Sequence, residues 1–362
     1  MSLVQEIVDV TLPNKKYQIL IGPGLHQSLP DHMHSLQGEH VILITDDKVA
    51  GFWLKPFASQ MSNIVSRLDE IVVREGEPSK SVETCNQLWQ KMLEMGADRR
   101  TIVVALGGGV VGDLAGFLAA SFARGIRFVQ IPTSLLAQVD SSVGGKVGIN
   151  LPQSKNMVGA FWQPESVIID PLVLQTLDEP NFRAGMAEVI KYGLIMDDEF
   201  FHFLKSSVDP IRGRDPQILA KVIAWCCRCK AQVVEEDEKE TSGRRVILNY
   251  GHTYGHAIEN VFGYGTFLHG EAIAIGMTCA ARLAMELGMV DSDFLKSQTE
   301  LFLEFGLPVE CPENRHDELL DAMKRDKKVA AGKLSLILPT RIGNVVSMAA
   351  PSDEKIRNSL VN

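Results

Sequence analysis

The chain has 362 residues, which is long for a single hydrophobic core and fits two domains. Hydrophobic residues make up 45% of it and charged residues 22%, the balance of an ordinary globular protein. Its 36 basic and 45 acidic residues give a net charge of −9, which argues against a nucleic-acid partner or an anionic membrane surface. An anionic ligand would therefore need a local basic pocket.

The N-terminal segment carries acids and no apolar core like that of a signal peptide. No apolar run in the sequence reaches the roughly 18 residues of a membrane span. We therefore expect a cytoplasmic protein without a membrane partner.

From residue 17 to about residue 170, short β-branched runs alternate with helical segments. This alternation is typical of a mostly parallel sheet with helices on both faces. The predicted strands are Tyr17–Ile21, His40–Thr45, Ile71–Val73, Thr101–Leu106, Arg127–Ile131 and Val167–Asp170.

After Pro180 the strand runs nearly vanish, and amphipathic segments such as Ile218–Val234 and Glu271–Leu287 predict helices. Lys333–Pro339 is the exception and is interpreted as a late strand. We predict an α/β domain over residues 1–176 and a mainly helical domain over residues 177–362. No flexible linker separates the two halves, so we expect the domains to meet closely and to leave a ligand cleft.

A glycine-rich turn follows the predicted strand Thr101–Leu106 and precedes a helical run. Gly107, Gly109 and Gly112 satisfy Gly-x-Gly-x-x-Gly in the strand-to-helix context that dinucleotide binding requires. A tight packing turn is the structural alternative. The acid that usually ends the next strand is missing, so Asp46 and the Glu75–Lys80 segment are the candidates for binding the ribose.

The segment Asp140–Asn150 combines an acid, hydroxyls, glycines and Lys146, with Lys155 and Asn156 close behind. Lysine beside bare backbone suits a phosphate or a carboxylate, although a solvated β-hairpin explains the segment equally well. It is not a Walker loop, because Val147 follows the lysine.

The six cysteines are unevenly spaced, which predicts reduced thiols rather than a disulfide framework. Cys226 and Cys229 form a Cys-x-x-Cys in a helical-looking run with no second pair nearby. We favour packed helix thiols over a zinc or redox site there.

Three of the nine histidines fall within eighteen residues, at His252, His256 and His269. On a helix, His252 and His256 would lie on one face, as two ligands of a catalytic zinc site do. The alternative is that these are ordinary buried histidines on a capped helix. The following motif His269-Gly-Glu271 favours a metal site over that alternative. No Glu follows His252, so the His-Glu-x-x-His motif of metalloproteases is absent.

Taken together, these segments resemble the 3-dehydroquinate synthase family of sugar-phosphate cyclases nearly end to end. Several long motifs in order are more specific than any one of them. They are Gly76–Lys80, Gly107–Asp113, Gln130–Lys146, Ala187–Gly193, Asn249–Glu259 and His269–Ala272. The resemblance implies an NAD-binding α/β domain, a helical metal-binding domain and a homodimer.

The resemblance also implies the site residues. Zinc, or cobalt or another divalent metal, would be held by Glu188, His252 and His269, with room left for substrate. The implied NAD contacts are Asp46, Glu75, Gly76, Glu77, Pro78, Ser79, Lys80, Gly109, Val110, Val111, Gly112, Asp113, Thr133, Ser134, Lys146, Lys155, Val173, Leu174, Gln175 and Thr176. The implied substrate pocket is Arg124, Asp140, Lys146, Asn156, Lys191, Lys230, Arg245, Asn249 and His256.

The implied reaction belongs to the shikimate pathway of aromatic amino acid biosynthesis. It converts 3-deoxy-D-arabino-heptulosonate 7-phosphate into 3-dehydroquinate and phosphate through transient oxidation at C5, β-elimination, re-reduction and aldol closure. His256 and Asn249 would assist proton transfer at C5. Lys146, Asn156 and His256 would hold the phosphate, while Lys230 and Arg245 would orient the carboxylate.

Two positions depart from the family pattern. Ser335 stands where a basic residue is usual, and Lys333, two positions back on the same strand face, could substitute for it. Arg245 is chosen over Arg244 because it stands four residues before Asn249. Two other functions are alternatives to this reaction. One is that of another sugar-phosphate cyclase, but Asn156 and His256 stand at positions where such enzymes tend to differ. The other is that of a metal-dependent polyol dehydrogenase, which would need no basic pocket for a phosphate.

Overall fold

The computed structural model describes residues 3–152, 154–263, 265–312, 315–325 and 334–361. The chain divides into two compact units. The first comprises Met1–Leu177 and Arg214–Lys239, and the second comprises Asp178–Gly213 and Glu240–Asn362.

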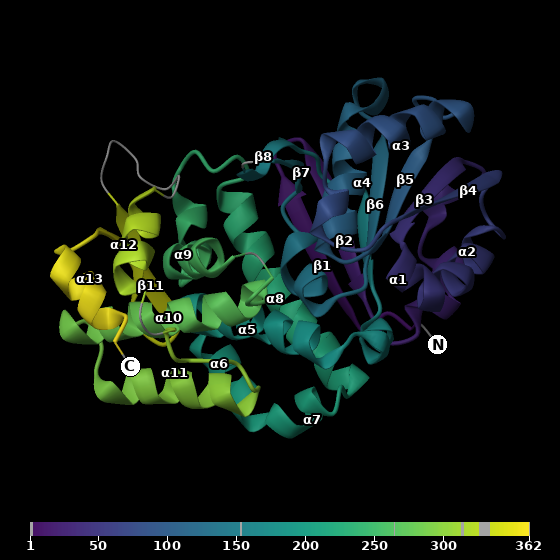
Figure 1. Ribbon diagram of the computed structural model, residues 1–362. Coiled ribbons are helices and arrows are strands. Elements are labelled where there is room, and N and C mark those ends of the chain that lie inside the picture. Colours follow the sequence, from purple (N-terminus) through teal and green to yellow (C-terminus); the bar gives the residue numbers. More distant parts are fainter. Residues whose placement is uncertain (1–2, 153, 264, 313–314, 326–333, 362) are drawn as a thin grey trace. The chain divides into compact units, whose positions relative to one another are not determined.

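The first unit is built on a seven-stranded sheet in the order β1-β2-β9-β6-β5-β3-β4 (Figure 1). Its strands are β1 (Glu6–Leu12), β2 (Lys15–Ile21), β3 (His40–Asp46), β4 (Arg67–Val73), β5 (Ile102–Gly107), β6 (Arg127–Pro132) and β9 (Ser166–Ile169). Only β1 and β2 pair antiparallel, and every other neighbouring pair is parallel. The mostly parallel sheet predicted from the sequence is confirmed.

Each predicted strand of the first half corresponds to a strand of this sheet, with shifts at the ends. The prediction missed β1, whose residues alternate between exposed and buried at the sheet edge. It also left the segment after Asp140 open between a ligand-binding turn and a hairpin. The structure forms a hairpin there, β7 (Lys146–Leu151) with β8 (Ser154–Phe161).

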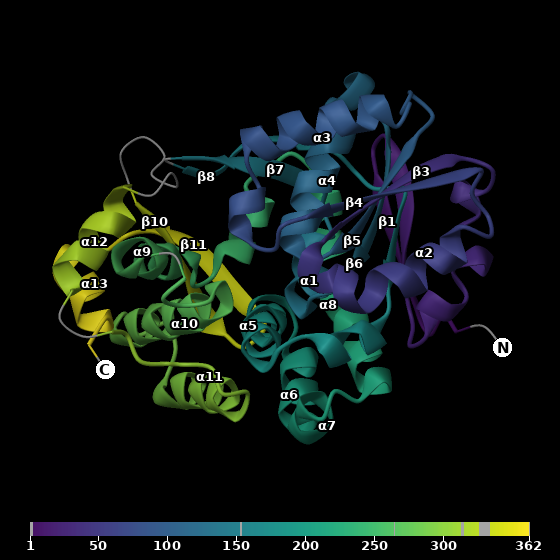
Figure 2. The same ribbon diagram turned by 45° about the vertical axis from the view of Figure 1, so that its right-hand side comes forward.

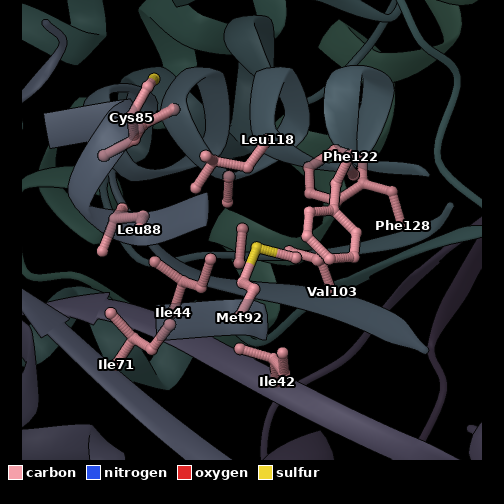
Figure 3. Close-up of a cluster of buried hydrophobic side chains, with 14 of the residues drawn as sticks. Ile42, Ile44, Ile71, Cys85, Leu88, Met92, Val103, Leu118, Phe122 and Phe128 are labelled. Atoms are coloured by element: carbon pink, nitrogen blue, oxygen red, sulfur yellow. The ribbon is translucent and has the colours of Figure 1, made fainter. Parts of the chain in front are cut away.

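Apolar clusters cover both faces of the sheet, as buried parallel strands require. One cluster joins the sheet to α3 (Val82–Glu94) and α4 (Gly109–Ser121), with Met92 and Phe128 among its buried side chains (Figure 3). The other cluster includes Phe57 of α2 (Lys55–Met61), which follows the short helix α1 (Asp47–Val49).

The long helix α8 (Pro216–Glu236) belongs to the first unit, where it packs on β1 and β2. The boundary predicted at residue 176 put this segment in the second domain. Amphipathic periodicity shows that a helix has an apolar face, but not which sheet covers that face. Cys226, Cys227 and Cys229 on α8 are buried and form no disulfide among the described residues, as the packed-thiol interpretation expected.

The second unit is mainly helical. Its helices are α5 (Glu179–Met196), α6 (Asp198–Ser206), α7 (Val208–Arg212), α9 (His252–Phe262), α10 (His269–Glu286), α11 (Ser292–Glu304), α12 (His316–Arg325) and α13 (Asp353–Ser359). Within it, α10 packs against α5, α9 and α11 (Figure 2). The predicted late strand is β10 (Ser335–Arg341), which pairs antiparallel with β11 (Asn344–Ala349).

Across the part of the chain that the structure describes, no helix combines the length and the apolarity needed to cross a membrane.

Candidate functional site

The glycine turn of the first unit leaves backbone donors open to a ligand. Strand β5 ends at Gly107, and α4 begins at Gly109 with Gly108 as its N-cap. Among the described residues, no side chain caps α4, so N–H groups of its first turn remain available to an anion such as a pyrophosphate. A Cβ at Gly109 would lie 3.1 Å from Ser141 Oγ, so this turn and the segment around residue 141 are close neighbours.

The other predicted NAD contacts lie mainly at the carboxyl ends of the parallel strands, where ligands of open α/β sheets bind. Asp46 ends β3 and pairs in register with Val73 of β4, two residues before Glu75. Burial raises the pKa of Asp46, and the nearby charge of Glu75 adds to the rise. Thr133 follows β6, and its backbone N–H donates to the carbonyl of Gly107 at 2.9 Å.

Side chains of Val173 and Leu174 are buried in the segment Pro171–Thr176, so only their backbone could meet a cofactor. The hydroxyl of Thr176 accepts a hydrogen bond from the indole N–H of Trp53 at 2.7 Å.

A buried lysine joins predicted NAD contacts to a predicted phosphate contact. Lys80 is 4% exposed, and its Nζ donates to Asp113 Oδ2 at 2.7 Å and to Asn156 Oδ1 at 2.6 Å. Burial raises the pKa of Asp113, and the charge of Lys80 opposes that rise. Because the oxygen of the Asn156 amide accepts from Lys80, its NH₂ group is left to donate to another acceptor.

A second buried cation is tied to Asp140. Asp140 lies in a π-helical turn, Ala137–Ser141, and its Oδ1 is 2.8 Å from Lys230 Nζ on α8. Lys230 also donates to the carbonyl oxygen of Asp140 at 2.7 Å. The charge of Lys230 also acts on Asp113, so the structure brings Lys80, Asp113, Asn156, Asp140 and Lys230 into one region of the first unit.

Three other predicted residues of the first unit lie at its surface or on the hairpin. Lys146 is exposed at the start of β7, and Lys155 lies on β8. Arg124 is exposed in a left-handed turn (φ 68°) just beyond the end of α4. A helix of 13 residues is roughly 20 Å long, so Arg124 lies away from the glycine turn.

In the second unit, three predicted metal ligands converge. Glu188 comes from the middle of α5, while His252 and His269 are the first residues of α9 and α10. Glu188 Oε1 lies 3.7 Å from His252 Nε2 and 3.9 Å from His269 Nε2. Ligand atoms around a tetrahedral zinc are about 3.3–3.5 Å apart, so a small contraction would complete the site.

The environment of Glu188 also fits a cation. Both carboxylate oxygens are buried and lack a hydrogen-bond partner among the described residues, although Lys191 forms an ion pair with Oε2. A buried carboxylate without hydrogen bonds is costly unless a positive charge compensates it. Lys191 supplies a positive charge at Oε2, and a divalent metal between Glu188, His252 and His269 would supply one at Oε1, the oxygen that faces both imidazoles.

A second group of possible ligand atoms consists of His256, Glu259 and His269. The His-x-x-x-His spacing alone pointed to His252 and His256 as a pair. The structure instead groups His252 with Glu188 and His269, and His256 with Glu259 and His269. Glu259 was absent from the predicted site residues, although its place three residues after His256 puts it on the same face of α9.

Burial lowers the pKa of His269, but the hydrogen bond and the charge of Glu259 outweigh this effect, and the charge of Glu188 adds to theirs. The pKa of His269 is therefore raised.

Close backbone approaches hold the helices that carry these ligands. A Cβ at Gly270 would lie 1.8 Å from the carbonyl oxygen of Ala184, one turn before Glu188 on α5. A Cβ at Gly276 would lie 2.2 Å from the carbonyl oxygen of Gly251, which precedes α9. Bare glycines on α10 therefore allow α5, α9 and α10 to bring Glu188, His252 and His269 together.

The substitution Gly270→Ala tests this packing. We expect it to destabilise the second unit by about 1–3 kcal/mol, because backbone atoms must shift to admit the methyl group. Chemical denaturation monitored by circular dichroism measures the loss. Gly51→Ala is the control, since a Cβ there meets nothing within 4 Å, and it should leave stability unchanged or slightly higher. Equal stability of the two variants would contradict the packing role of Gly270.

Three further predicted substrate contacts lie in the second unit. Lys191 and Arg245 are buried, and Arg245 Nε lies 3.6 Å from Glu240 Oε1. The half-buried side chain of Asn249 has no hydrogen-bond partner among the described residues, so its amide is available to a ligand. The hydroxyl of Ser335 is hydrogen-bonded within the β10–β11 hairpin, and Lys333 lies outside the described residues.

Comparison with known proteins gives consistent matches. The family model of the 3-dehydroquinate synthase N-terminal domain matches residues 70–184, and that of the C-terminal domain matches residues 185–329. A 3-dehydroquinate synthase of Rhodopirellula baltica is 48% identical over 358 residues, covering 97% of this chain and 96% of that protein.

Two solved structures are similar over nearly their whole length. The 2-epi-5-epi-valiolone synthase of Streptomyces hygroscopicus, with NAD⁺ and Zn²⁺ bound, has a TM-score of 0.88 at 27% identity, covering 97% of each chain. A 2-deoxy-scyllo-inosose synthase complexed with carbaglucose-6-phosphate, NAD⁺ and Co²⁺ has a TM-score of 0.87 at 26% identity, covering 98% of this chain and 100% of the other.

Proposed function

Because this chain belongs to the 3-dehydroquinate synthase family, we propose that it converts 3-deoxy-D-arabino-heptulosonate 7-phosphate into 3-dehydroquinate and phosphate. It is an enzyme of the carbon–oxygen lyase class, since the step that releases phosphate breaks a carbon–oxygen bond. The geometric observation that carries the proposal is the buried carboxylate of Glu188 facing two imidazole nitrogens.

Two bound groups are part of the proposal. The glycine turn before α4 would hold NAD, which would supply reversible hydride transfer at C5 of the substrate with no net oxidation. Zinc, or cobalt or another divalent metal, held by Glu188, His252 and His269, would lower the pKa of the C5 hydroxyl. Related cyclases with NAD⁺ and Zn²⁺ or Co²⁺ bound support both assignments.

In the second unit, His256 and Asn249 are proposed to move the proton at the C5 hydroxyl. The His256 ring lies 5.4 Å from that of His252, centroid to centroid, so it is one side chain away from the proposed metal ligands. Lys191 and Arg245 are buried cations suited to an anionic substrate, and Arg245 would orient its carboxylate end.

In the first unit, Asn156, with Lys146, is proposed to bind the phosphate. Lys80 supports this role, because it engages the oxygen of the Asn156 amide and leaves the NH₂ group to donate. Lys230, paired with Asp140, is also proposed to orient a substrate carboxylate. Arg124 is also a proposed substrate contact. Within this chain it lies beyond the end of α4, away from the glycine turn. The homodimer and the cytoplasmic location implied by the resemblance are also part of the proposal.

A coupled assay tests the function. The enzyme receives the heptulosonate phosphate, a catalytic amount of NAD⁺ and a divalent metal, while released phosphate and NADH are measured together. We expect phosphate in proportion to substrate and no lasting NADH. Stoichiometric NADH formed with a neutral polyol would indicate a polyol dehydrogenase instead. Faster turnover of glucose 6-phosphate or sedoheptulose 7-phosphate would indicate another sugar-phosphate cyclase.

A further inference from the structure

Both proposed histidine ligands have a partner on the ring nitrogen that faces away from Glu188. His252 Nδ1 lies 3.1 Å from the carbonyl oxygen of Tyr250, and His269 Nδ1 lies 3.4 Å from Glu259 Oε2. The Nε2 atoms of both rings face Glu188 Oε1. The two partners differ in charge, since a carbonyl is neutral and a carboxylate is anionic.

Glu259 is placed to act on His269. It lies on α9, seven residues after His252, and its side chain is 10% exposed. A carboxylate on the far nitrogen of a ligand imidazole fixes the ring orientation and makes the ligating nitrogen more basic. The hydrogen bond connects α9 to the first residue of α10, so it also fixes where that helix begins relative to the proposed site.

We propose that Glu259 is a positioning residue for His269. Its carboxylate accepts the Nδ1–H hydrogen bond and selects the tautomer whose Nε2 lone pair points to the metal site of Glu188 and His252. The inference rests on the proposed assignment of Glu188, His252 and His269 as metal ligands.

The competing arrangement makes Glu259 itself a ligand, together with His256 and His269. A neutral imidazole carries only one lone pair on its two nitrogens, so His269 can serve the metal on one side only. A metal beside Glu259 would leave Glu188 Oε1 buried without a hydrogen-bond partner among the described residues and without a nearby cation, since Lys191 pairs with Oε2. The cost of that burial favours the metal on the side of Glu188, with Glu259 outside the ligand set.

The test measures metal affinity rather than turnover. Purified apo-enzyme is titrated with Zn²⁺ against a chromophoric chelator, and Co²⁺ loading is followed by its visible absorption. Glu259→Leu is expected to weaken Zn²⁺ binding by about 10–100-fold. Glu259→Gln should weaken it less, because the amide oxygen still accepts from Nδ1–H. At saturating metal, both variants should bind as many metal ions as the wild type.

Glu271→Leu is the matched control for Glu259→Leu. Glu271 lies two residues after His269, and its Oε2 accepts from the backbone N–H of Leu268 at 2.9 Å, so it supports the start of α10 through the backbone. This variant should have a lower melting temperature and an unchanged Zn²⁺ affinity. The control therefore distinguishes an effect of reduced helix stability on Zn²⁺ affinity from the effect of removing the hydrogen-bond partner of the His269 imidazole.

Wild-type affinity in both Glu259 variants would overturn the positioning role. Loss of metal even at saturating concentration would overturn it as well, because Glu259 would then be a ligand. His269→Ala in the same titration tests the premise separately. If His269→Ala binds Zn²⁺ as tightly as the wild type, the proposed metal site fails, whatever the Glu259 variants show.

Discussion

Replacing His269 by alanine is expected to abolish metal binding and to reduce turnover to the level of the metal-stripped enzyme. His269 Nε2 lies 3.9 Å from Glu188 Oε1. Without His269, only Glu188 and His252 would remain as ligands, whereas a catalytic zinc site typically has three protein ligands. Metal content after dialysis measures the loss directly. Added Zn²⁺ should not restore activity to the variant.

Thermal unfolding provides a second measurement. A metal that binds only the folded state stabilises the wild type by about 2.7 kcal/mol at a concentration 100 times its Kd, whereas the His269→Ala variant should gain nothing. His202→Ala is the control, because His202 is an exposed histidine of α6 outside both possible ligand groups. Stoichiometric Zn²⁺ at unchanged affinity in His269→Ala would refute the ligand assignment.

Replacing His256 by alanine is expected to leave metal content intact while kcat falls by about 10²–10⁴-fold, the usual contribution of a positioned acid–base group. His256 lies outside the Glu188–His252–His269 group, yet its ring lies 5.4 Å from His252 and 6.1 Å from His269, centroid to centroid. Metal analysis and steady-state kinetics on the same preparation distinguish the two effects.

His256→Gln refines this result. Glutamine can still donate a hydrogen bond to a phosphate but cannot exchange a proton near neutral pH, so KM should recover more than kcat. Metal loss in His256→Ala equal to that in His269→Ala would assign His256 to the ligand set. In that event the group of His256, Glu259 and His269 would be the metal site.

Local sequence pattern predicted most of the first unit correctly. Strands β3, β5 and β6 are β-branched runs buried on both faces, and such runs are recognisable wherever they occur. Edge strand β1 was missed, although Val8, Val10 and Leu12 alternate with exposed residues as in a half-buried strand. The hairpin β7–β8 was one of two open interpretations, since glycines and a lysine suit a ligand-binding turn and a solvated hairpin alike.

The sequence by itself determined the two-part architecture, the glycine turn and, through the resemblance of ordered motifs, the reaction family. Only the tertiary structure decided that α8 packs in the first unit, that Glu259 faces His269, and that Lys80 links Asp113 to Asn156. The physical reason is that periodicity reports which face of an element is apolar, while the partner of that face comes from a distant part of the chain. The proposed ligand group is an example, because Glu188 meets His252 and His269 only through the packing of three helices around bare glycines.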